Sequence, residues 1–324
     1  MEYADLIWDR NEEMHKEFIK NLAPIVLFTY NRLDHTRQTI EALQKNVYAL
    51  ESVLYIYSDA PKNEKAIESV NMVRDYLYSV TGFKEIHIIE REENWGLARN
   101  IIDGVTKIVN QYGKIIVLED DIVTSKWFLK YMNDALAIYQ CKECVMSING
   151  YALPMDTTGV PETYFLKFAD CWGWATWDRA WKYFERDVDT SLYDFSDAEV
   201  RAFNFENSTD YYKQITDNKN GKLYTWAIFW YAAVFKANGL GLMVRESLSV
   251  NIGCDSTGEH CGDDNTFLSV LSNVPVDKFP LCIEESLQGR LQTIRFWQSL
   301  QRSFFNRVTG IIKRILKTML GDFN

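Results

Sequence analysis

The sequence predicts an α/β protein in which a mostly parallel, Rossmann-like central sheet is flanked by helices. From residue 23 onward, short apolar runs alternate with amphipathic stretches that have the length of helices. Parallel strands need helix-length connections, and such crossovers are right-handed. With 47% hydrophobic and 25% charged residues, the composition is globular, so wholesale disorder, collagen-like repetition and a coiled coil are excluded. The 324 residues suffice for one large domain or two smaller ones.

Four β–α units are expected in series in the first half of the chain. The apolar runs that we predict as strands are residues 25–30, 53–57, 85–89 and 114–118. The stretches that we predict as helices are residues 34–45, 64–79, 97–111 and 127–139. Asp34 is predicted to cap the first of these helices. After Gly150 the periodicity weakens and aromatic residues accumulate, so the second half is predicted to be mixed α+β and to share one core with the first.

Charged side chains follow each of the four predicted strands. They are Arg32, Asp59, Arg91 and the triplet Glu119-Asp120-Asp121. In an open parallel sheet, ligands bind outside the carboxyl ends of the strands, so we expect these side chains to converge on one site. Neither Gly-x-Gly-x-x-Gly nor Gly-x4-Gly-Lys-Ser/Thr occurs, which disfavours a dinucleotide site and a P-loop triphosphate site.

The acid triplet is the sharpest single feature of the sequence. Three successive acids after a buried strand concentrate negative charge where it is unfavourable unless a cation is bound. Carboxylate oxygens suit Mg²⁺ or Mn²⁺, which keep several waters and share their coordination with phosphates. A metal ion held here would neutralise the diphosphate that leaves a nucleotide-sugar. The alternative is that two of the acids only cap a helix beginning near Ser125, which would leave the polar residues at the other strand ends unexplained.

Between Pro24 and Phe267 the sequence resembles the glycosyltransferases of the GT-A fold. It is most similar to the branch that contains N-acetylglucosaminyltransferase I and the bacterial family-2-like enzymes of polysaccharide loci. Three segments carry the resemblance: Pro24-Ile-Val-Leu-Phe-Thr-Tyr-Asn-Arg32, Asn94-Trp-Gly-Leu-Ala-Arg-Asn100 and the acid triplet, which corresponds to the Asp-x-Asp motif of that family.

The resemblance implies a role for each matching residue. Asp121 would bind the metal ion, and Asp59 would read the uracil ring. Glu119 and Asp120 would face the sugar and the ribose. The other residues that it brings toward the nucleotide are Thr29, Asn31, Arg32, Asn94, Gly96, Arg99 and Asn100.

The segment Phe168–Trp177 is similar to the aromatic Gly-Trp segment that lies under the donor sugar and the acceptor in that family. Aromatic faces stack on the C–H face of a pyranose, so Trp172 and Trp174 are assigned to the sugar or the acceptor. Gly173 is assigned with them because glycine allows a close backbone approach. Trp177 and Trp181 are spaced by four residues, and we expect them in the core.

Residues 251–261 form a polar, glycine-containing loop that is expected to close over a diphosphate. His260 in this loop is assigned as a metal ligand or a phosphate donor. Inverting transfer also needs a carboxylate base, which in N-acetylglucosaminyltransferase I lies in a Trp-Asp-Asp-Trp segment. The corresponding stretch here, Tyr224–Trp230, contains no acid. The candidate bases are therefore Asp170, then Asp255 and Glu259, with Asp178 as a more distant option.

Charge and tail composition constrain the partners. The net charge of −10 argues against nucleic acid. Residues 289–320 carry seven basic residues and no acid, while apolar residues recur at helical spacing from Leu287 onward. This pattern predicts a basic amphipathic helix, which either attaches to an anionic membrane surface or packs on the acidic body of the protein.

Other features favour a cytoplasmic protein, peripheral at the inner face of the plasma membrane if the tail binds lipid. No apolar run approaches the roughly 20 residues that span a bilayer. The first ten residues lack the pattern of a secretory signal. Six cysteines are too few for a disulfide scaffold in a chain of this length, and Cys141-Lys-Glu-Cys144 lacks the further ligands of a zinc site.

The sequence therefore predicts a metal-dependent, inverting glycosyltransferase of surface polysaccharide synthesis, with Mn²⁺ or Mg²⁺ as its cofactor. It would move a hexose or N-acetylhexosamine from a UDP-sugar to a saccharide acceptor, polyprenyl-linked if the tail binds a membrane. The alternatives are a nucleotidyltransferase and a catalytically silent sugar- or nucleotide-binding module. The predicted regions are an N-terminal helical extension (1–22), a nucleotide-sugar-binding half (23–150), an acceptor-side half of the same domain (151–286) and the basic helix (287–324).

Overall fold

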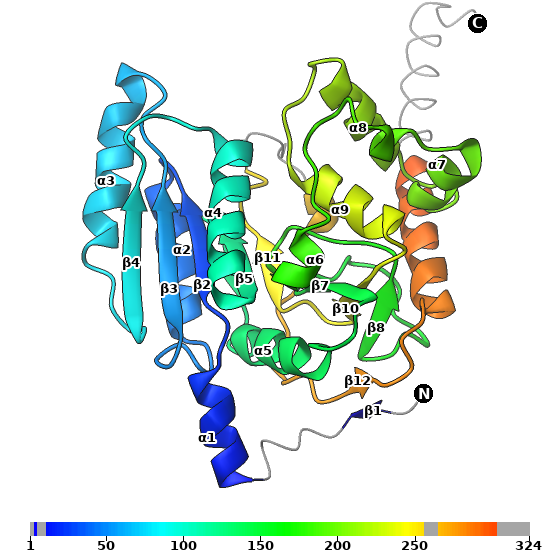
Figure 1. The fold of residues 1–324 in the computed structure, drawn as a ribbon, viewed down its shortest axis with the longest axis horizontal. Coiled ribbons are helices and arrows are strands. Elements are labelled where there is room, and N and C mark those ends of the chain that lie inside the picture. Colours follow the sequence, from blue (N-terminus) through cyan, green and yellow to red (C-terminus); the bar gives the residue numbers. More distant parts are fainter. Residues whose placement is uncertain (1–2, 5–10, 256–264, 303–324) are drawn as a thin grey trace, which may run out of the picture.

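The centre of the protein is an eight-stranded sheet with the order β4-β3-β2-β5-β9-β7-β10-β8 (Figure 1). The computed structural model describes residues 3–4, 11–255 and 265–302. The first four strands in this order are parallel, β9 is antiparallel to both of its neighbours, and β10 is parallel to β7. In spatial order the strands are β4 (Glu85–Glu90), β3 (Val53–Ser58), β2 (Ile25–Thr29), β5 (Lys114–Glu119), β9 (Trp174–Trp177), β7 (Val145–Asn149), β10 (Leu240–Val244) and β8 (Thr163–Leu166).

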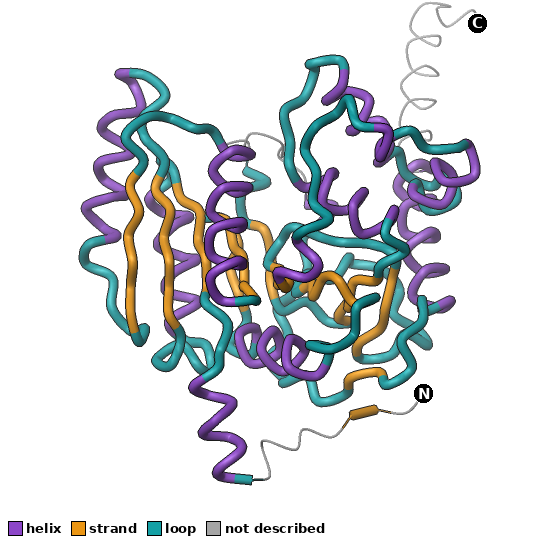
Figure 2. The backbone as a smooth tube through the Cα atoms, in the orientation of Figure 1, coloured by secondary structure: helices purple, strands orange, loops and turns teal. Residues whose placement is uncertain are grey.

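Helices cover both faces of the sheet, so that the strands lie between two helical layers (Figure 2). One face packs on α2, α3 and α5, and the other on α4, α6 and α9. The helices are α1 (Glu12–Lys20), α2 (Leu33–Gln44), α3 (Ile67–Leu77), α4 (Leu97–Tyr112), α5 (Phe128–Ile138), α6 (Asp178–Trp181), α7 (Asp197–Phe203), α8 (Tyr211–Lys219) and α9 (Ala227–Lys236). Two small sheets pair β6 (Ile122–Thr124) with β11 (Ser249–Asn251) and β1 (Tyr3–Ala4) with β12 (Phe279–Pro280).

The four predicted β–α units are confirmed, and the α/β class with a mixed second half is correct. Helix α4 shows why apolar residues at helical spacing predict a helix. Its Ile101, Val105 and Ile108 form one buried stripe along the helix. The predicted cap of α2 is wrong. This helix begins at Leu33, and Asp34 lies in its first turn, where a negative charge is still favoured by the helix dipole.

The strand register brings the carboxyl ends of β4, β3, β2 and β5 to a single edge of the sheet. Thr29 pairs with Ser58, Ser58 pairs with Glu90, and Phe28 pairs with Glu119. Residues that follow these strands therefore emerge side by side. The large buried cluster under α2, α3 and α5 also contains side chains of β7, β8 and β10, so both halves of the chain contribute to it.

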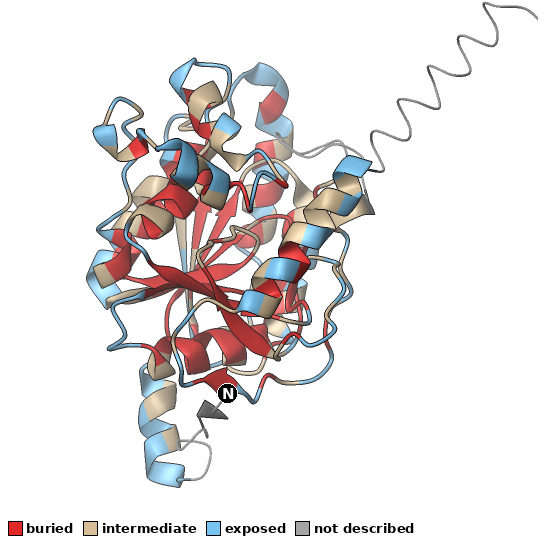
Figure 3. Cartoon of the chain, turned by 90° about the vertical axis from the view of Figure 1, so that its right-hand side faces the viewer, coloured by how far each residue is buried: buried red, intermediate tan, exposed pale blue. Residues whose placement is uncertain are grey.

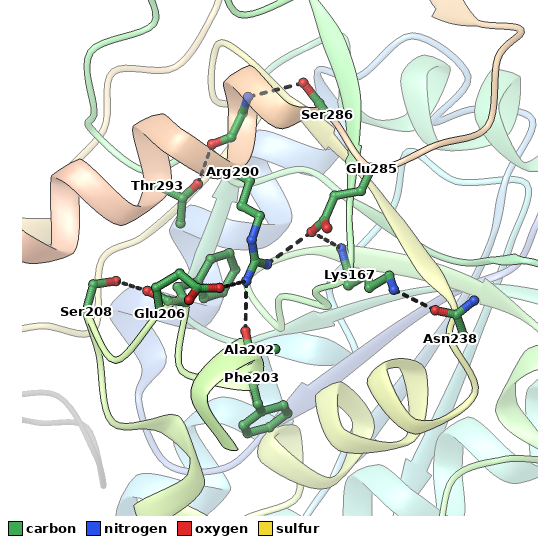
Figure 4. A network of polar contacts seen from close by, with 12 residues as sticks. Lys167, Ala202, Phe203, Glu206, Ser208, Asn238, Glu285, Ser286, Arg290 and Thr293 are labelled. Atoms are coloured by element: carbon green, nitrogen blue, oxygen red, sulfur yellow. Dashed lines mark hydrogen bonds and ion pairs between the residues drawn. The ribbon is translucent and has the colours of Figure 1, made fainter. Parts of the chain in front are cut away.

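Residues 287–302 form a C-terminal helix that packs on the body of the protein with one side and leaves the other side exposed (Figure 3). Arg290 anchors it, because its guanidinium donates to Glu285 at 3.2 Å, to Glu206 at 3.3 Å and to the carbonyl of Ala202 at 3.1 Å (Figure 4). This part of the tail uses its charge for packing, as the second alternative predicted. The rest of the predicted basic helix lies outside the described residues.

None of the helices in the described ranges is long and apolar enough to cross a membrane.

Candidate active site

A cleft of about 650 Å³ opens at the carboxyl edge of the parallel strands. Its walls come from the ends of β2, β3 and β5, from the N-terminus of α4, and from the connection between α8 and α9. The predicted site residues that line it are Thr29, Asn31, Arg32, Asp59, Asn94, Gly96, Asn100, Glu119, Asp120, Asp121 and Trp172. These side chains therefore lie together along one cleft at this edge of the sheet.

Arg32 and two acids of the triplet form an ionic cluster at the floor of this cleft. Arg32 immediately precedes α2, and Asp120 and Asp121 form the turn between β5 and β6. The guanidinium donates to Asp121 Oδ2 at 2.8 Å and also pairs with Asp120. Burial disfavours the charge of Arg32, but the two carboxylates outweigh this effect and raise its pKa. Burial raises the pKa of Asp120 as well, although Arg32 opposes that shift.

The cluster retains unused hydrogen-bonding capacity. Nη1 of Arg32 is buried and has no hydrogen-bond partner within the described ranges. Arg32 lies beside both carboxylates and offsets part of the cost of burying their charge. This arrangement can hold an anion against Arg32 or a second cation against the acids.

The segment after β11 packs directly on the cluster. The backbone N–H of Ile252 donates to the carbonyl of Asp121 at 2.9 Å. A Cβ on Gly253 would lie 2.2 Å from Asp121 Oδ2 and 2.9 Å from Arg32 Nη1, so only glycine fits at this position without displacing the cluster. Gly253 is therefore required for the close approach of this segment to the cluster.

Asp255, a candidate base, lies at the end of this segment, where its carboxylate is 3.2 Å from Nε2 of His35. His35 was not among the predicted site residues. Its side chain is only 14% exposed and lies beside Asp255. The sequence signal that could have placed His35 near the site is its position three residues after Arg32, on the first turn of α2. Glu259 and His260 lie outside the described residues.

Asp59 anchors the loop that leads into α4. Its two carboxylate oxygens accept hydrogen bonds from the backbone N–H groups of Ala60, Trp95 and Gly96 and from the side chain of Asn94, at 2.8–3.2 Å. A carboxylate offers about four acceptor sites, so these four donors satisfy it. Asp59 therefore builds the wall of the cleft, and residues 96–98 at the start of α4 line the cavity.

Two predicted members of the site point elsewhere. Arg91 was expected at the carboxyl edge, but its side chain is buried and donates to Asn100 at 2.9 Å and to Asp103 at 2.6 Å. Arg99 does not line the cleft and stacks on Trp95 at 4.0 Å, while Arg91 stacks on the same ring at 3.9 Å. Both arginines fix the entry to α4 by cation–π contact.

Some aromatic residues of the segment Phe168–Trp177 line the cleft, and others lie in the core. Trp172 lines the cleft, as predicted. Trp174 was assigned to the sugar or acceptor, but it is fully buried and stacks on Trp226 at 5.5 Å. The expectation that Trp177 and Trp181 belong to the core is confirmed. Gly173 has φ of +85°, and a Cβ there would lie 3.0 Å from Phe128, so core packing requires this glycine.

Asp170 precedes Trp172, and its carboxylate faces a narrow second cavity between Tyr151, Tyr211 and Trp297. The backbone N–H of Trp172 donates to it at 2.7 Å. Burial raises the pKa of Asp170 to about 6, although this hydrogen bond opposes the shift. Asp178 is a poor candidate base because its backbone bonds to Gly113, beside the opposite edge of β5.

Neither a family model nor a curated protein sequence matches the chain. Among solved structures, it is similar to the mannosyltransferase PcManGT from Pyrobaculum calidifontis in complex with GDP-Man and Mn²⁺, with a TM-score of 0.39, 10% identity and coverage of 72% of this chain and 76% of that one. It is also similar to TarS from S. aureus, with a TM-score of 0.37, 13% identity and coverage of 70% and 36%.

A third similar structure is mouse xyloside xylosyltransferase 1 in its apo form, with a TM-score of 0.34, 9% identity and coverage of 66% and 81%. Two of these three proteins, the mannosyltransferase and the xylosyltransferase, are glycosyltransferases by name. TM-scores below 0.5 describe only a partial overlap of folds, so the functional proposal rests on the residues of the cleft.

The role of Asp59 predicts a measurable effect on stability. Asp59→Asn replaces one acceptor oxygen by an NH₂ group that faces backbone N–H donors. We expect the free energy of unfolding to fall by about 1–3 kcal/mol, because buried donors lose their partner. Urea denaturation followed by far-UV circular dichroism measures the change. Asp34→Asn, on the exposed first turn of α2, is the control, and equal stability of the two variants would contradict the anchoring role.

Proposed function

We propose that the chain is a metal-dependent glycosyltransferase that moves a sugar from a UDP-sugar to a saccharide hydroxyl in surface polysaccharide synthesis. The observation that carries this proposal is the cluster of Arg32, Asp120 and Asp121 on the floor of a deep cleft at the carboxyl edge of a parallel sheet. A nucleoside diphosphate needs both a cationic partner and a metal ion, and this cluster provides the residues for both.

The donor set fits a divalent ion that substrate helps to coordinate. The described residues contain no group of three or more His, Cys, Asp or Glu side chains suited to a metal ion. Mg²⁺ and Mn²⁺ are commonly held by only one or two carboxylates, with phosphates and waters completing the shell. Asp121 would hold the ion, with His260 proposed as a further ligand, and Asp120 beside it would face the sugar and the ribose. When bound, the ion supplies Lewis-acid stabilisation of the departing diphosphate.

Residues of the cleft have proposed roles in binding, and acids outside its lining are proposed for proton transfer. Arg32 would pair with the diphosphate, and the N-terminal turn of α4 would direct backbone N–H groups toward it. Asp170 would take the proton of the acceptor hydroxyl, since its raised pKa of about 6 suits a base that works near neutral pH. Asp255 and Glu259 are the alternative bases. Inversion at the anomeric carbon follows if a single base-assisted displacement occurs.

A polyprenyl-linked acceptor and attachment to an anionic membrane belong to the same proposal. On the described part of the tail, Leu287 is 72% exposed and Arg295 and Arg302 lie on the same helix. Sedimentation with anionic and neutral lipid vesicles tests the attachment. We expect binding only to anionic vesicles, and equal sedimentation with both would argue against it.

A catalytically silent binding module is the second candidate, because Asp170 faces the narrow second cavity and not the cleft. UDP release from UDP-sugars in the presence of Mn²⁺ distinguishes the two. A silent module would bind UDP without any turnover.

The metal assignment predicts the behaviour of Asp121→Ala. We expect Mn²⁺ to strengthen UDP binding to the wild type, and this gain to shrink at least tenfold in the variant, because the carboxylate that links the ion to the protein is lost. Isothermal titration calorimetry with and without Mn²⁺ measures the gain. Asp34→Ala serves as the surface control, and an unchanged gain in Asp121→Ala would remove the metal assignment.

Arg32 and a metal ion compete for the same carboxylates, which predicts an opposite pair of effects in Arg32→Gln. Without nucleotide, the variant should bind Mn²⁺ more tightly than the wild type at pH 8, because the acids have lost their internal counter-cation. Its affinity for UDP should fall. Electron paramagnetic resonance of free Mn²⁺ reports the first quantity, and calorimetry reports the second. Arg37→Gln, on the exposed side of α2, should change neither, and weaker Mn²⁺ binding in Arg32→Gln would refute the competition.

The base assignment predicts a pH profile. The carboxylate form of Asp170 is lost as pH falls through about 6, so UDP-sugar turnover should decline below that pH. Asp170→Asn should lower kcat by about 10²-fold or more while UDP affinity stays within twofold. Asp178→Asn, at the opposite edge of the sheet, is the control. If Asp170→Asn keeps the wild-type rate and the same decline of the rate at low pH, Asp170 is not the base, and Asp255 or Glu259 takes that role.

A further inference from the structure

The two walls of the cleft differ in charge. Every charged residue that lines it in the described part of the chain comes from the first half, including Arg32, Asp59 and Lys62. The lining residues from the second half are uncharged, and Trp172, Gln214 and Tyr224 are among them. A diphosphate needs the charged wall, whereas a neutral sugar avoids the desolvation of ionic groups on the uncharged one.

We infer that Tyr224 is a stacking platform for an uncharged pyranose ring of the acceptor. This inference rests on the proposed function and names one subsite within it. Tyr224 lies between α8 and α9 on the uncharged wall, and 63% of it is exposed. An aromatic ring that lines a cavity and is largely exposed offers the kind of surface on which the C–H face of a sugar stacks.

Arg186 holds the ring of Tyr224 from behind. Its guanidinium carbon lies 4.6 Å from the centroid of Tyr224 and 4.4 Å from that of the buried Phe229. Arg186 Nη2 also donates to Asn218 Oδ1 at 3.1 Å, which fixes the guanidinium plane. One face of Tyr224 is therefore supported by a cation–π contact, and the opposite face remains available.

Asn218 fixes the backbone that carries this ring. Its Oδ1 accepts a hydrogen bond from the N–H of Thr225 at 2.9 Å, and its Nδ2 donates to Thr225 Oγ1 at 3.0 Å and to the carbonyl of Gln214 at 2.7 Å. The platform is thus ordered before any ligand arrives, which reduces the entropy lost on binding. The side-chain amide of Gln214 lines the same wall and can bond to sugar hydroxyls.

The stacked group could otherwise be the nucleobase of the donor, so the test separates the two. The probes are the methyl β-glycosides of glucose, galactose, N-acetylglucosamine and glucuronic acid, studied by saturation-transfer difference NMR with and without UDP and Mn²⁺. UDP affinity is measured in parallel by calorimetry. The variants are Tyr224→Ala, Tyr224→Phe and Tyr78→Ala, which removes a similarly exposed tyrosine at the end of α3.

We expect saturation transfer to the ring protons of at least one neutral glycoside in the wild type, Tyr224→Phe and Tyr78→Ala. In Tyr224→Ala the transfer should fall at least fivefold while UDP affinity stays within twofold. The glucuronide should show little transfer to any of the four proteins.

The inference is overturned if the wild type gives no transfer to any neutral glycoside, if the glucuronide binds as well as they do, or if Tyr224→Ala leaves the transfer unchanged. A fivefold or larger loss of UDP affinity in Tyr224→Ala would also overturn it, because the ring would then stack on the nucleobase. Loss of glycoside binding in Tyr224→Ala without any UDP binding by the wild type would support the platform and refute the proposed function.

Discussion

The pairing of Arg32 with Asp120 and Asp121 is the interaction on which the rest of the cleft depends. Two adjacent carboxylates at the end of a buried strand repel each other and lose solvation, which is costly unless a cation lies beside them. The guanidinium supplies that cation within the chain. Because the same carboxylates suit a divalent ion, and the same guanidinium suits a diphosphate, the pair is stable by itself and is also suited to exchange partners when a nucleotide binds.

The surrounding fold fixes this cluster from three directions. The register of the parallel strands aligns the ends of β2, β3 and β5, so Arg32, Asp59 and the acids emerge at one edge. Asp59 ties the loop before α4 to the end of β3. Gly253 lets the chain after β11 lie against Asp121 and Arg32 without a side chain between them. The uncharged wall with Tyr224 closes the opposite side, so ionic and neutral surfaces face each other across one cavity.

The parts that the sequence could predict are those set by local periodicity and chain order. The four β–α units, the common edge and the convergence of Arg32 with the acids follow from apolar repeats and the handedness of crossovers. The misassigned side chains depend on long-range packing. Trp174 is drawn into the core by Trp226 and Trp230, which lie about 50 residues later, and Arg91 turns away because Asp103 of α4 offers a closer partner. Tyr224 begins the stretch that was compared with the base-bearing segment of N-acetylglucosaminyltransferase I, but its place on the cleft wall depends on the contacts of Arg186 and Asn218, which the sequence does not show.

The most direct test is anomalous X-ray diffraction at the manganese edge from crystals of the full chain grown with UDP and MnCl₂. A single strong peak within coordination distance of Asp121 and of both phosphates, with Arg32 turned toward the diphosphate, is the predicted result. UDP bound in the cleft with no manganese peak beside Asp121, or UDP bound at another place on the protein, would contradict the central claim.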